Sequence, residues 1–252
     1  MSGWVKVVGL GPGAETMVTP EVTAALDAAT DIVGYIPYVA RVAPRAGLTL
    51  HPSDNRVEAE RARAALDMAR AGRRVVVVSS GDPGVFAMAA AVLEVLTPAD
   101  DTLDVQVLPG ITAMLAAAAR AGAPLGHDFC AINLSDNLKP WALVERRLRL
   151  AAEADFAMAF YNPRSKSRPE GFAKVLGILR DACGPDRLIT FARAVSTPDE
   201  RLVTVTLAEA RPEMADMRTV VLVTNSLGRR AGRFVYSPRS VPAGPDPAGT
   251  PA

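Results

Sequence analysis

The chain has 252 residues, of which 49% are hydrophobic and 22% are charged, and its formal net charge at pH 7 is +1. This composition excludes a disordered protein, and the near-neutral charge argues against a general nucleic-acid binder, because such proteins carry a basic excess. No signal-peptide pattern opens the sequence, and charges interrupt every apolar run before it reaches membrane-spanning length, so we expect a soluble cytoplasmic protein. Cys130 and Cys183 are far apart and are expected to be small buried side chains.

In the first half of the chain, apolar strand-like runs alternate with alanine-rich helical runs, which is typical of a parallel α/β sheet. We expect strands at 6–9, 31–35, 74–79 and 103–108, and helices from Thr19 and at 57–71, 85–96 and 111–121. Thr19 and Pro20 form an N-terminal helix signal, with threonine as the cap and proline at the first helical position. Residues 74–79 (RVVVVS) are almost entirely apolar, so this strand is expected to be central and covered on both faces.

The segment 121–128 (AGAPLGHD) is rich in glycine and proline and is the expected boundary between two domains, 1–122 and 128–232. Beyond it we expect strands at 130–134, 156–161, 188–192, 202–207 and 219–224, the last two close enough to include antiparallel pairing, and helices at 141–152 and 169–182. Ser167 and Glu170 have capping-box spacing at the start of the second of these helices. Residues 236–252 are expected to form a disordered tail.

The glycine-rich turn at 9–14 fits the pattern G-x-G-x-x-A of dinucleotide-binding proteins. In that fingerprint the glycines run directly into a helix, and an acidic residue ends the second strand. Here five residues separate the turn from the helix signal at Thr19, Asp31 begins the second strand instead of ending it, and Pro12 removes a backbone donor. The context argues against a nicotinamide site, and an NAD(P) oxidoreductase is kept only as an alternative.

Two further strands end in similar loops, at 79–84 (SSGDPG) and 108–112 (LPGIT). Ligands of open α/β sheets bind at the carboxyl ends of the strands. Any one of these loops is explained equally well as a simple chain turn. Three of them together favour a ligand cleft.

Four segments, VVGLGPGA, SSGDPGVF, VLPGITA and FYNPRS, resemble the tetrapyrrole methylase family in order and spacing. The resemblance covers nearly the whole chain, to about residue 230. It implies two α/β domains with a ligand cleft between them, an enzyme that uses S-adenosylmethionine and releases S-adenosylhomocysteine, and a homodimer.

Within the family, VGYIPY (33–38), the block 110–136 and YNPRS are most similar to the branch that methylates C-17 of precorrin-3B. That reaction contracts the macrocycle and yields precorrin-4 in cobalamin biosynthesis. Methylation of a precorrin at C-11 or C-20, diphthine synthesis, RNA ribose methylation and a non-catalytic tetrapyrrole carrier remain alternatives, as does the choice between a metal-free and a cobalt-loaded substrate.

The resemblance implies a cofactor site in which the SGDPGV turn holds the amino-acid end and the ribose, and residues after two later strands lie near the adenine. The matching positions are Pro12, Ser80, Gly81, Asp82, Val85, Thr112, Ala113, Asn162 and Val195. Uroporphyrinogen methylases carry an acidic residue after the tyrosine of the second strand. Ile36 stands there in this chain, so that general base is not carried over.

Asp136 and Ser135, on the turn after an expected strand, are candidates for the acid–base work of ring contraction, although a helix cap before Pro140 explains them equally well. The substrate is a polyanion, and the densest basic run, 164–168, lies between a strand and a helix. The expected substrate-binding side chains are Arg164 and Lys166, supported by Lys139 and Arg41, with Tyr35 and Tyr38 stacking on the macrocycle. No metal site is expected, because His51 and His127 lack partners at ligand spacing.

Overall fold

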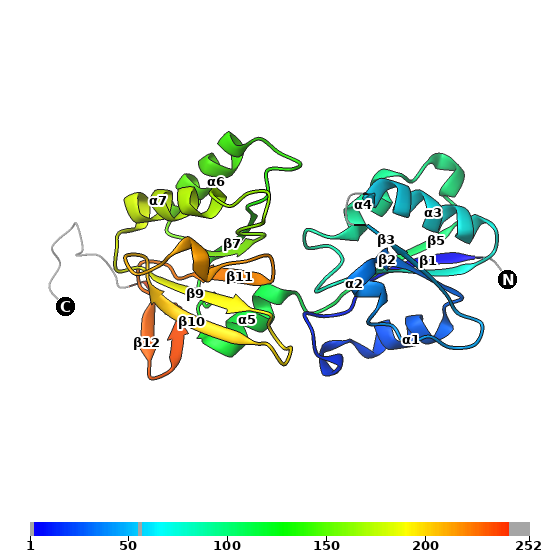
Figure 1. Cartoon of the computed structure of the whole chain (residues 1–252), viewed down its shortest axis with the longest axis horizontal. Helices are drawn as coiled ribbons and strands as arrows, with labels where there is room; N and C mark the ends of the chain where they lie inside the picture. The colour runs from blue at the N-terminus through cyan, green and yellow to red at the C-terminus, as the bar shows by residue number, and fades with distance from the viewer. Residues whose placement is uncertain (1–2, 55–56, 242–252) are drawn as a thin grey trace, which may run out of the picture. The chain divides into compact units, whose positions relative to one another are not determined.

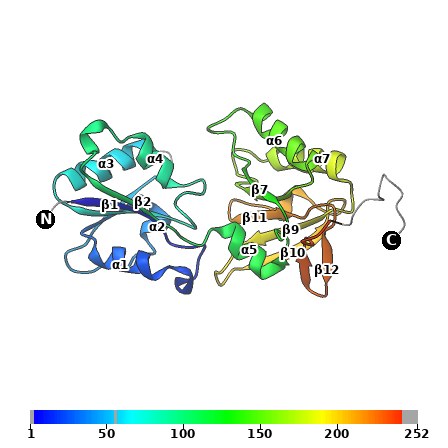
Figure 2. The ribbon, with the colours of Figure 1, turned by 180° about the vertical axis from the view of Figure 1, so that it is seen from behind.

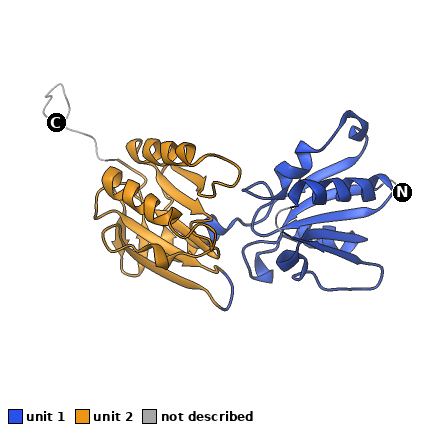
Figure 3. Cartoon of the chain, turned by 45° about the horizontal axis from the view of Figure 1, so that its top comes forward, with its two compact units in different colours: residues 1–116, 196–198 blue, residues 117–195, 199–252 orange. Residues whose placement is uncertain are grey.

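The computed structural model describes residues 3–54 and 57–241 (Figure 1). The chain divides into two compact units, Met1–Ala116 with Ser196–Pro198, and Ala117–Val195 with Asp199–Ala252 (Figure 3). Each unit contains a five-stranded sheet with helices packed against it, which confirms the expected α/β class. The chain passes from one unit to the other inside helix α5 (Ala113–Ala121). That 121–128 is the boundary between two domains stays a prediction.

The first unit is built on a fully parallel sheet in the order β3-β2-β4-β1-β5. Its strands are β1 (Trp4–Gly9), β2 (Asp31–Tyr35), β3 (Thr49–Ser53), β4 (Arg74–Ser79) and β5 (Asp104–Leu108). β4 is central, as predicted. Val75 and Val77 pack on one face of the sheet, and Val76 and Val78 pack on the other, all fully buried.

Helices cover both faces of this sheet (Figures 1 and 2). The helices are α1 (Pro20–Ala28) and α2 (Ile36–Val39) on one face, and α3 (Glu58–Arg70) and α4 (Met88–Glu94) on the other. The predicted cap of α1 is confirmed, because Val22 N donates to Thr19 Oγ1 at 3.3 Å and Pro20 is the first helical residue. α4 begins three residues later than expected, since Phe86 has a φ of 54° and Ala87 is extended.

The second unit is built on a mixed sheet in the order β10-β9-β11-β8-β7. Its strands are β7 (Phe129–Asn133), β8 (Ala157–Tyr161), β9 (Leu188–Arg193), β10 (Arg201–Thr206) and β11 (Thr219–Val223). β7 and β8 are parallel, whereas β10 and β11 each pair antiparallel with β9, which lies between them. Antiparallel pairing was expected for these last two strands, and each makes it with β9. Helices α6 (Trp141–Glu153) and α7 (Gly171–Cys183) bury their apolar residues against this sheet.

A small third sheet, not foreseen from the sequence, joins β6 (Gly122–Ala123) to the hairpin of β12 (Arg229–Ala231) and β13 (Phe234–Tyr236). Ser237 is buried, and its hydroxyl donates to the carbonyl of Pro124 at 2.7 Å. The expectation of a disordered tail from residue 236 is therefore wrong at its beginning, because Tyr236 and Ser237 are tied to the 122–124 segment. Residues 242–252 lie outside the described part of the chain.

The predicted capping box at 167–170 is also wrong. Helix α7 starts at Gly171, and its N-cap residue, Glu170, makes no capping hydrogen bond with its side chain. The hydroxyl of Ser167 lies 3.1 Å from that of Ser165 instead, since residues 165–168 close a tight turn before the helix. Three 3-10 helices complete the described elements, η1 (Glu15–Met17), η2 (Pro98–Asp100) and η3 (Pro212–Met214).

Candidate functional site

The three glycine-containing loops meet at the carboxyl edge of the first sheet. β1 lies between β4 and β5, and all three are parallel, so their ends at Gly9, Ser79 and Leu108 are neighbours. Gly11 N donates to the carbonyl of Gly81 at 3.1 Å, and Gly81 N donates back to Gly11 O at 2.9 Å. The sequence-based expectation that these loops come together at one edge of the sheet is confirmed, and that they bind a ligand stays a prediction.

Glycine is required where these backbones touch. A Cβ atom on Gly9 or on Gly110 would lie 2.3 Å from the carbonyl oxygen of Gly81, which no side chain tolerates without a backbone shift. At Gly81 itself the constraint is conformational, since its φ is +65° and a Cβ would find only ordinary contacts. The loops therefore form a cradle in which backbones lie in close mutual contact, with Gly9 and Gly81 buried and Gly110 half-buried.

Asp82 joins two of the loops through its carboxylate. Oδ1 accepts a hydrogen bond from Gly84 N at 2.8 Å, and Oδ2 accepts one from Gly110 N at 3.0 Å. The turn-forming role that such a residue commonly has is therefore present here. A contact between the same carboxylate and a ligand stays a prediction.

Seven of the nine predicted cofactor positions lie on this edge: Pro12, Ser80, Gly81, Asp82, Val85, Thr112 and Ala113. Pro12 and Val85 are half-buried, while Thr112 is buried directly before α5. Arg41, expected to assist substrate binding, instead donates hydrogen bonds to carbonyls of the 9–14 loop. No local pattern around Arg41 indicates that role.

The other two predicted cofactor positions belong to the second unit. Asn162 follows β8 with a φ of 52°, and buried Val195 comes two residues after β9. β8 and β9 run in the same direction on either side of β11, so both positions lie at one edge of that sheet. Asn133, which was not predicted, accepts hydrogen bonds on its Oδ1 from Asn162 Nδ2 at 3.1 Å and from Ser135 N at 2.9 Å.

Arg168 organises the same edge of the second sheet. Its side chain is only 13% exposed, and its Nη1 and Nη2 donate to the carbonyls of Leu134 and Asn162 at 3.3 and 3.4 Å. Its Nε lies 3.6 Å from Oδ1 of Asp136, whose side chain is 42% exposed. Within the predicted basic run, Arg168 is the residue that the fold draws inward. Its position in the run gave no indication of this, because the turn at 165–168 decides it.

The predicted catalytic pair lies on the loop between β7 and α6, and its role in proton transfer stays a prediction. The helix-cap alternative for Asp136 and Ser135 is wrong, because Pro140 is the N-cap residue of α6. Ser135 Oγ instead accepts a hydrogen bond from Asn137 N at 3.4 Å. Asp136 also lines a pocket of about 330 Å³ with Leu134, Trp141, Arg168 and Lys174.

The side chains predicted to supply cationic contacts differ in their exposure and in the hydrogen bonds that they make within the protein. Lys166 is exposed, whereas Arg164 Nε donates to the carbonyl of Pro169 at 3.1 Å. Lys139 Nζ donates to the carbonyl of Ser135 at 2.8 Å, and burial together with the nearby guanidinium groups lowers the pKa of Lys139.

Tyr35 and Tyr38 form an edge-to-face pair, with ring centroids 5.3 Å apart. Burial raises the pKa of Tyr38, whose ring packs against the core cluster of α1 and β4. This arrangement supports a packing role for Tyr38, and stacking on a macrocycle stays a prediction for both.

Within residues 3–54 and 57–241, no three His, Cys, Asp or Glu side chains are grouped as a metal site would require. Helices long and apolar enough to cross a membrane are likewise absent from this part of the chain. His51 does have a partner, since its Nε2 lies 2.9 Å from Oδ1 of Asp31.

Known proteins are similar to this chain in both sequence and structure. The family model of the tetrapyrrole (corrin/porphyrin) methylases matches residues 5–211. The precorrin-3B C(17)-methyltransferase of a Sinorhizobium species is 49% identical over 247 residues, covering 95% of this chain and 97% of that protein. A crystal structure of the methyltransferase CobJ is similar with a TM-score of 0.92 and 70% identity, covering 94% of this chain and 100% of that one.

A more distant structure has a ligand. A uroporphyrin-III C-methyl transferase from Thermus thermophilus, complexed with S-adenyl homocysteine, has a TM-score of 0.66 and 26% identity, covering 88% of this chain and 92% of that one. The resemblance drawn from the four sequence segments is confirmed by these matches: the chain belongs to the tetrapyrrole methylase family.

Proposed function

We propose that this protein is an S-adenosylmethionine-dependent methyltransferase that methylates C-17 of precorrin-3B and contracts the ring to give precorrin-4 in cobalamin biosynthesis. The observation that carries the proposal is the similarity to a precorrin-3B C(17)-methyltransferase over nearly the full length of both chains. The methyltransferase CobJ supports the same reaction class.

The cradle at the carboxyl edge of the first sheet fits the cofactor. Gly9, Gly81 and Gly110 bring three backbones together without side chains between them, so peptide groups line the surface that a ligand would meet. A carboxylate beside it, Asp82, suits a cationic amino-acid moiety. Once bound, S-adenosylmethionine would supply an electrophilic methyl group for C-17 and would leave as S-adenosylhomocysteine. The residues of the chain orient that group and exclude water.

The second unit supplies cations for the carboxylate side arms of a tetrapyrrole. Arg164, Lys166 and Lys139 lie on loops at one edge of its sheet, and Arg168 holds that edge together. We assign Asp136, with Ser135, to proton transfer in ring contraction, with Arg168 fixing the orientation of the carboxylate. Asn162 and Val195 stay predicted cofactor contacts. A cytoplasmic location is proposed from the composition of the sequence, and a homodimer is proposed because the family resemblance implies it.

Binding measurements test the cofactor assignment first. Calorimetric titration should show that S-adenosylmethionine and S-adenosylhomocysteine bind, whereas NADH does not. Incubation with precorrin-3B and S-adenosylmethionine should then give a product heavier by one methyl group. Binding of NADH without either sulfur compound would make the protein an oxidoreductase and overturn the proposal.

A charge substitution tests the substrate assignment. Arg164→Ala should weaken precorrin-3B binding several-fold and reduce its salt sensitivity, because a partly exposed ion pair contributes on the order of 1 kcal/mol. The affinity for S-adenosylhomocysteine should stay at the wild-type value. Arg149→Ala is the matched control, since it removes the same charge from α6, where Arg149 pairs with Glu145. Equal effects of both variants would show that Arg164 contributes only a nonspecific charge effect to substrate binding.

A further inference from the structure

Arg41 grips the glycine loop that follows β1. Its Nη1 donates to the carbonyl of Gly11 at 3.0 Å, and its Nη2 donates to those of Leu10 and Gly13 at 2.5 and 3.1 Å. One guanidinium thus donates hydrogen bonds to three carbonyls within four consecutive residues. Burial lowers the pKa of Arg41, but a guanidinium keeps its charge at any physiological pH.

The same peptide groups are held from their opposite sides. In a trans peptide the carbonyl oxygen and the next amide hydrogen point in opposite directions, and the described chain has no cis peptide. The peptide whose oxygen is Leu10 O donates through Gly11 N to the carbonyl of Gly81 at 3.1 Å. The peptide whose oxygen is Gly13 O donates through Ala14 N to the hydroxyl of Ser196 at 3.1 Å. Arg41 therefore fixes the planes of two peptides whose amides are already engaged.

The middle peptide of the loop is held through its carbonyl alone. Its nitrogen belongs to Pro12, which has no hydrogen to donate, so only its carbonyl, Gly11 O, can be held. That oxygen accepts from Gly81 N at 2.9 Å and from Arg41 Nη1 at 3.0 Å, with Ser80 Oγ at 3.5 Å. Gly11 has a φ of +66°, a left-handed conformation that glycine adopts without strain, so the hydrogen bonds to its carbonyl and not backbone strain orient this peptide.

We propose that Arg41 is a positioning residue that holds the 9–14 loop in the shape that meets the cofactor. It acts through the three carbonyls and touches neither the cofactor nor the reacting atoms. Arg41 lies two residues after α2, and its chain neighbours include the Tyr35–Tyr38 pair. It therefore also ties the tyrosine segment to the glycine loop. The inference rests on the proposed function, because it assigns the loop to the cofactor.

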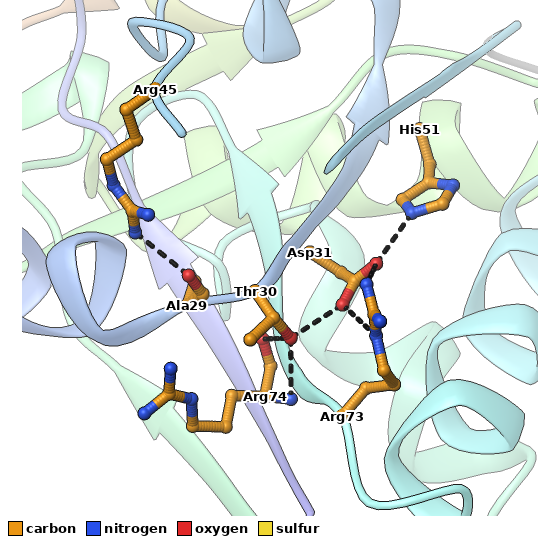
Figure 4. A network of polar contacts seen from close by, with 7 residues as sticks. All are labelled: Ala29, Thr30, Asp31, Arg45, His51, Arg73 and Arg74. Atoms are coloured by element: carbon orange, nitrogen blue, oxygen red, sulfur yellow. Dashed lines mark hydrogen bonds and ion pairs between the residues drawn. The ribbon is translucent and has the colours of Figure 1, made fainter. Parts of the chain in front are cut away.

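The chain provides a matched control in Arg45. Its Nη2 lies within 2.8 Å of the carbonyls of Leu26, Asp27 and Ala29, at the C-terminal end of α1 (Figure 4 draws the contact with Ala29). Arg45 thus also binds three carbonyls within four residues of chain, four positions after Arg41. These carbonyls belong to a helix end and not to a loop of the candidate site. Arg45→Ala should cost stability without changing cofactor affinity.

The experiment measures affinity and stability for the wild type, Arg41→Ala, Arg41→Lys and Arg45→Ala. We expect Arg41→Ala to raise the Kd for S-adenosylhomocysteine at least tenfold. Arg41→Lys should recover only part of this loss, because one ammonium cannot reproduce the planar spread of the two guanidinium nitrogens. Arg45→Ala should lower Tm by a comparable amount and leave Kd within twofold of the wild type.

Hydrogen exchange supplies a readout that does not depend on the ligand. In Arg41→Ala the amides of Gly11 and Ala14 should exchange at least tenfold faster, while the amide of Thr23, inside α1, should not change. If Arg41→Ala does not fold, Arg41→Lys carries the same two tests with smaller expected shifts.

The outcomes separate the two proposals. Wild-type protein that binds no S-adenosylhomocysteine would overturn the proposed function, and this inference with it. Wild-type binding together with an unchanged Kd in the Arg41 variants would overturn only the inference. Equal losses of affinity in the Arg41 and Arg45 variants would also overturn it, because general destabilisation would then account for the effect.

Discussion

The two edges of the first sheet are held together by different kinds of contact. At the carboxyl edge, backbone contacts backbone at Gly9, Gly81 and Gly110, and the carboxylate of Asp82 accepts hydrogen bonds from amide hydrogens. At the amino edge, side chains do the joining. Figure 4 shows Asp31, the first residue of β2, contacted by Thr30 directly before it, by His51 of β3 and by Arg73 directly before β4.

The amino-edge cluster consists of Asp31 with Thr30, His51 and Arg73. The Asp31 side chain is 2% exposed and accepts two hydrogen bonds from Arg73, at 2.7 and 2.8 Å, and one from Thr30 at 2.6 Å. His51 Nε2 lies 2.9 Å from its Oδ1. A buried carboxylate with every lone pair engaged stabilises a fold but leaves nothing for a ligand. The comparison teaches that the amino edge is stabilised by a buried carboxylate whose charge is neutralised, whereas the carboxyl edge is stabilised by direct contacts between backbones.

The largest expected effect comes from filling the carboxyl edge. Gly110→Val places a branched side chain where even a Cβ would lie 2.3 Å from Gly81 O, so it should destabilise the protein by about 3 kcal/mol or more and abolish S-adenosylhomocysteine binding. Urea denaturation and calorimetry measure both effects. Gly177→Val is the control, since no atom lies within 4 Å of a Cβ there. A Gly110→Val protein with wild-type affinity would contradict the backbone-contact account.

Breaking the amino edge should separate stability from binding. Asp31→Asn leaves donors of Arg73 and Thr30 facing an amide, so the free energy of unfolding should fall by about 2–3 kcal/mol. Folded molecules should bind S-adenosylhomocysteine as the wild type does. Loss of affinity in the folded variant would show that the two edges are not independent.

Acid should act through the same carboxylate. Burial alone would raise the pKa of Asp31, but the hydrogen bonds from Arg73, Thr30 and His51 outweigh it and lower the pKa from 3.8 to about 2. The folded pKa is the lower one, so the stabilisation is complete above about pH 4 and is lost as pH falls toward 2. The loss attributable to Asp31 is about 2 kcal/mol.

Unfolding curves between pH 5 and pH 2 measure this loss, and Asp31→Asn should lack the Asp31 part of it. Hydrogen bonds from arginine and threonine side chains and from backbone amides also lower the pKa values of Asp100 and Asp216. The variant should therefore keep the acid sensitivity that these two carboxylates cause. Identical pH dependence in both proteins would refute the assignment.

The smallest expected effect concerns a cap that belongs to neither edge. Thr19→Ala removes the acceptor of Val22 N and should cost about 1 kcal/mol of unfolding free energy, with no change in ligand affinity. Thr19→Ser keeps the hydroxyl and should restore most of the loss. Thermal denaturation of the three proteins is sufficient, and an unaffected Tm in Thr19→Ala would show that the cap contributes nothing measurable.

Much of this architecture could be predicted from local patterns in the sequence. The apolar run 74–79 became the central strand, and Thr19-Pro20 started α1. Signals of this kind are local, because periodicity and caps act within one element. The third sheet was missed since its strands have two or three residues, too few for a period to appear.

The site was predictable in outline but not in its contacts. Glycines after parallel strands indicated which loops converge, because strand ends in a parallel sheet share an edge. The grip of Arg41 and the inward turn of Arg168 depend on tertiary placement. The sequence alone does not distinguish an arginine whose side chain is solvated from one whose guanidinium donates hydrogen bonds to backbone carbonyls. The capping box predicted at 167–170 does not form for a related reason, because the side chain of Ser167 takes part in the turn that precedes the helix.

The position of the transferred methyl group tests the central claim most directly. Precorrin-3B incubated with S-adenosylmethionine labelled with ¹³C in its methyl group should yield a product whose labelled carbon correlates in NMR with C-17 of a contracted macrocycle. Methylation at C-11 or C-20 would add the same mass but give a different correlation. A label found at either of those carbons, or a labelled product with an uncontracted ring, would contradict the account.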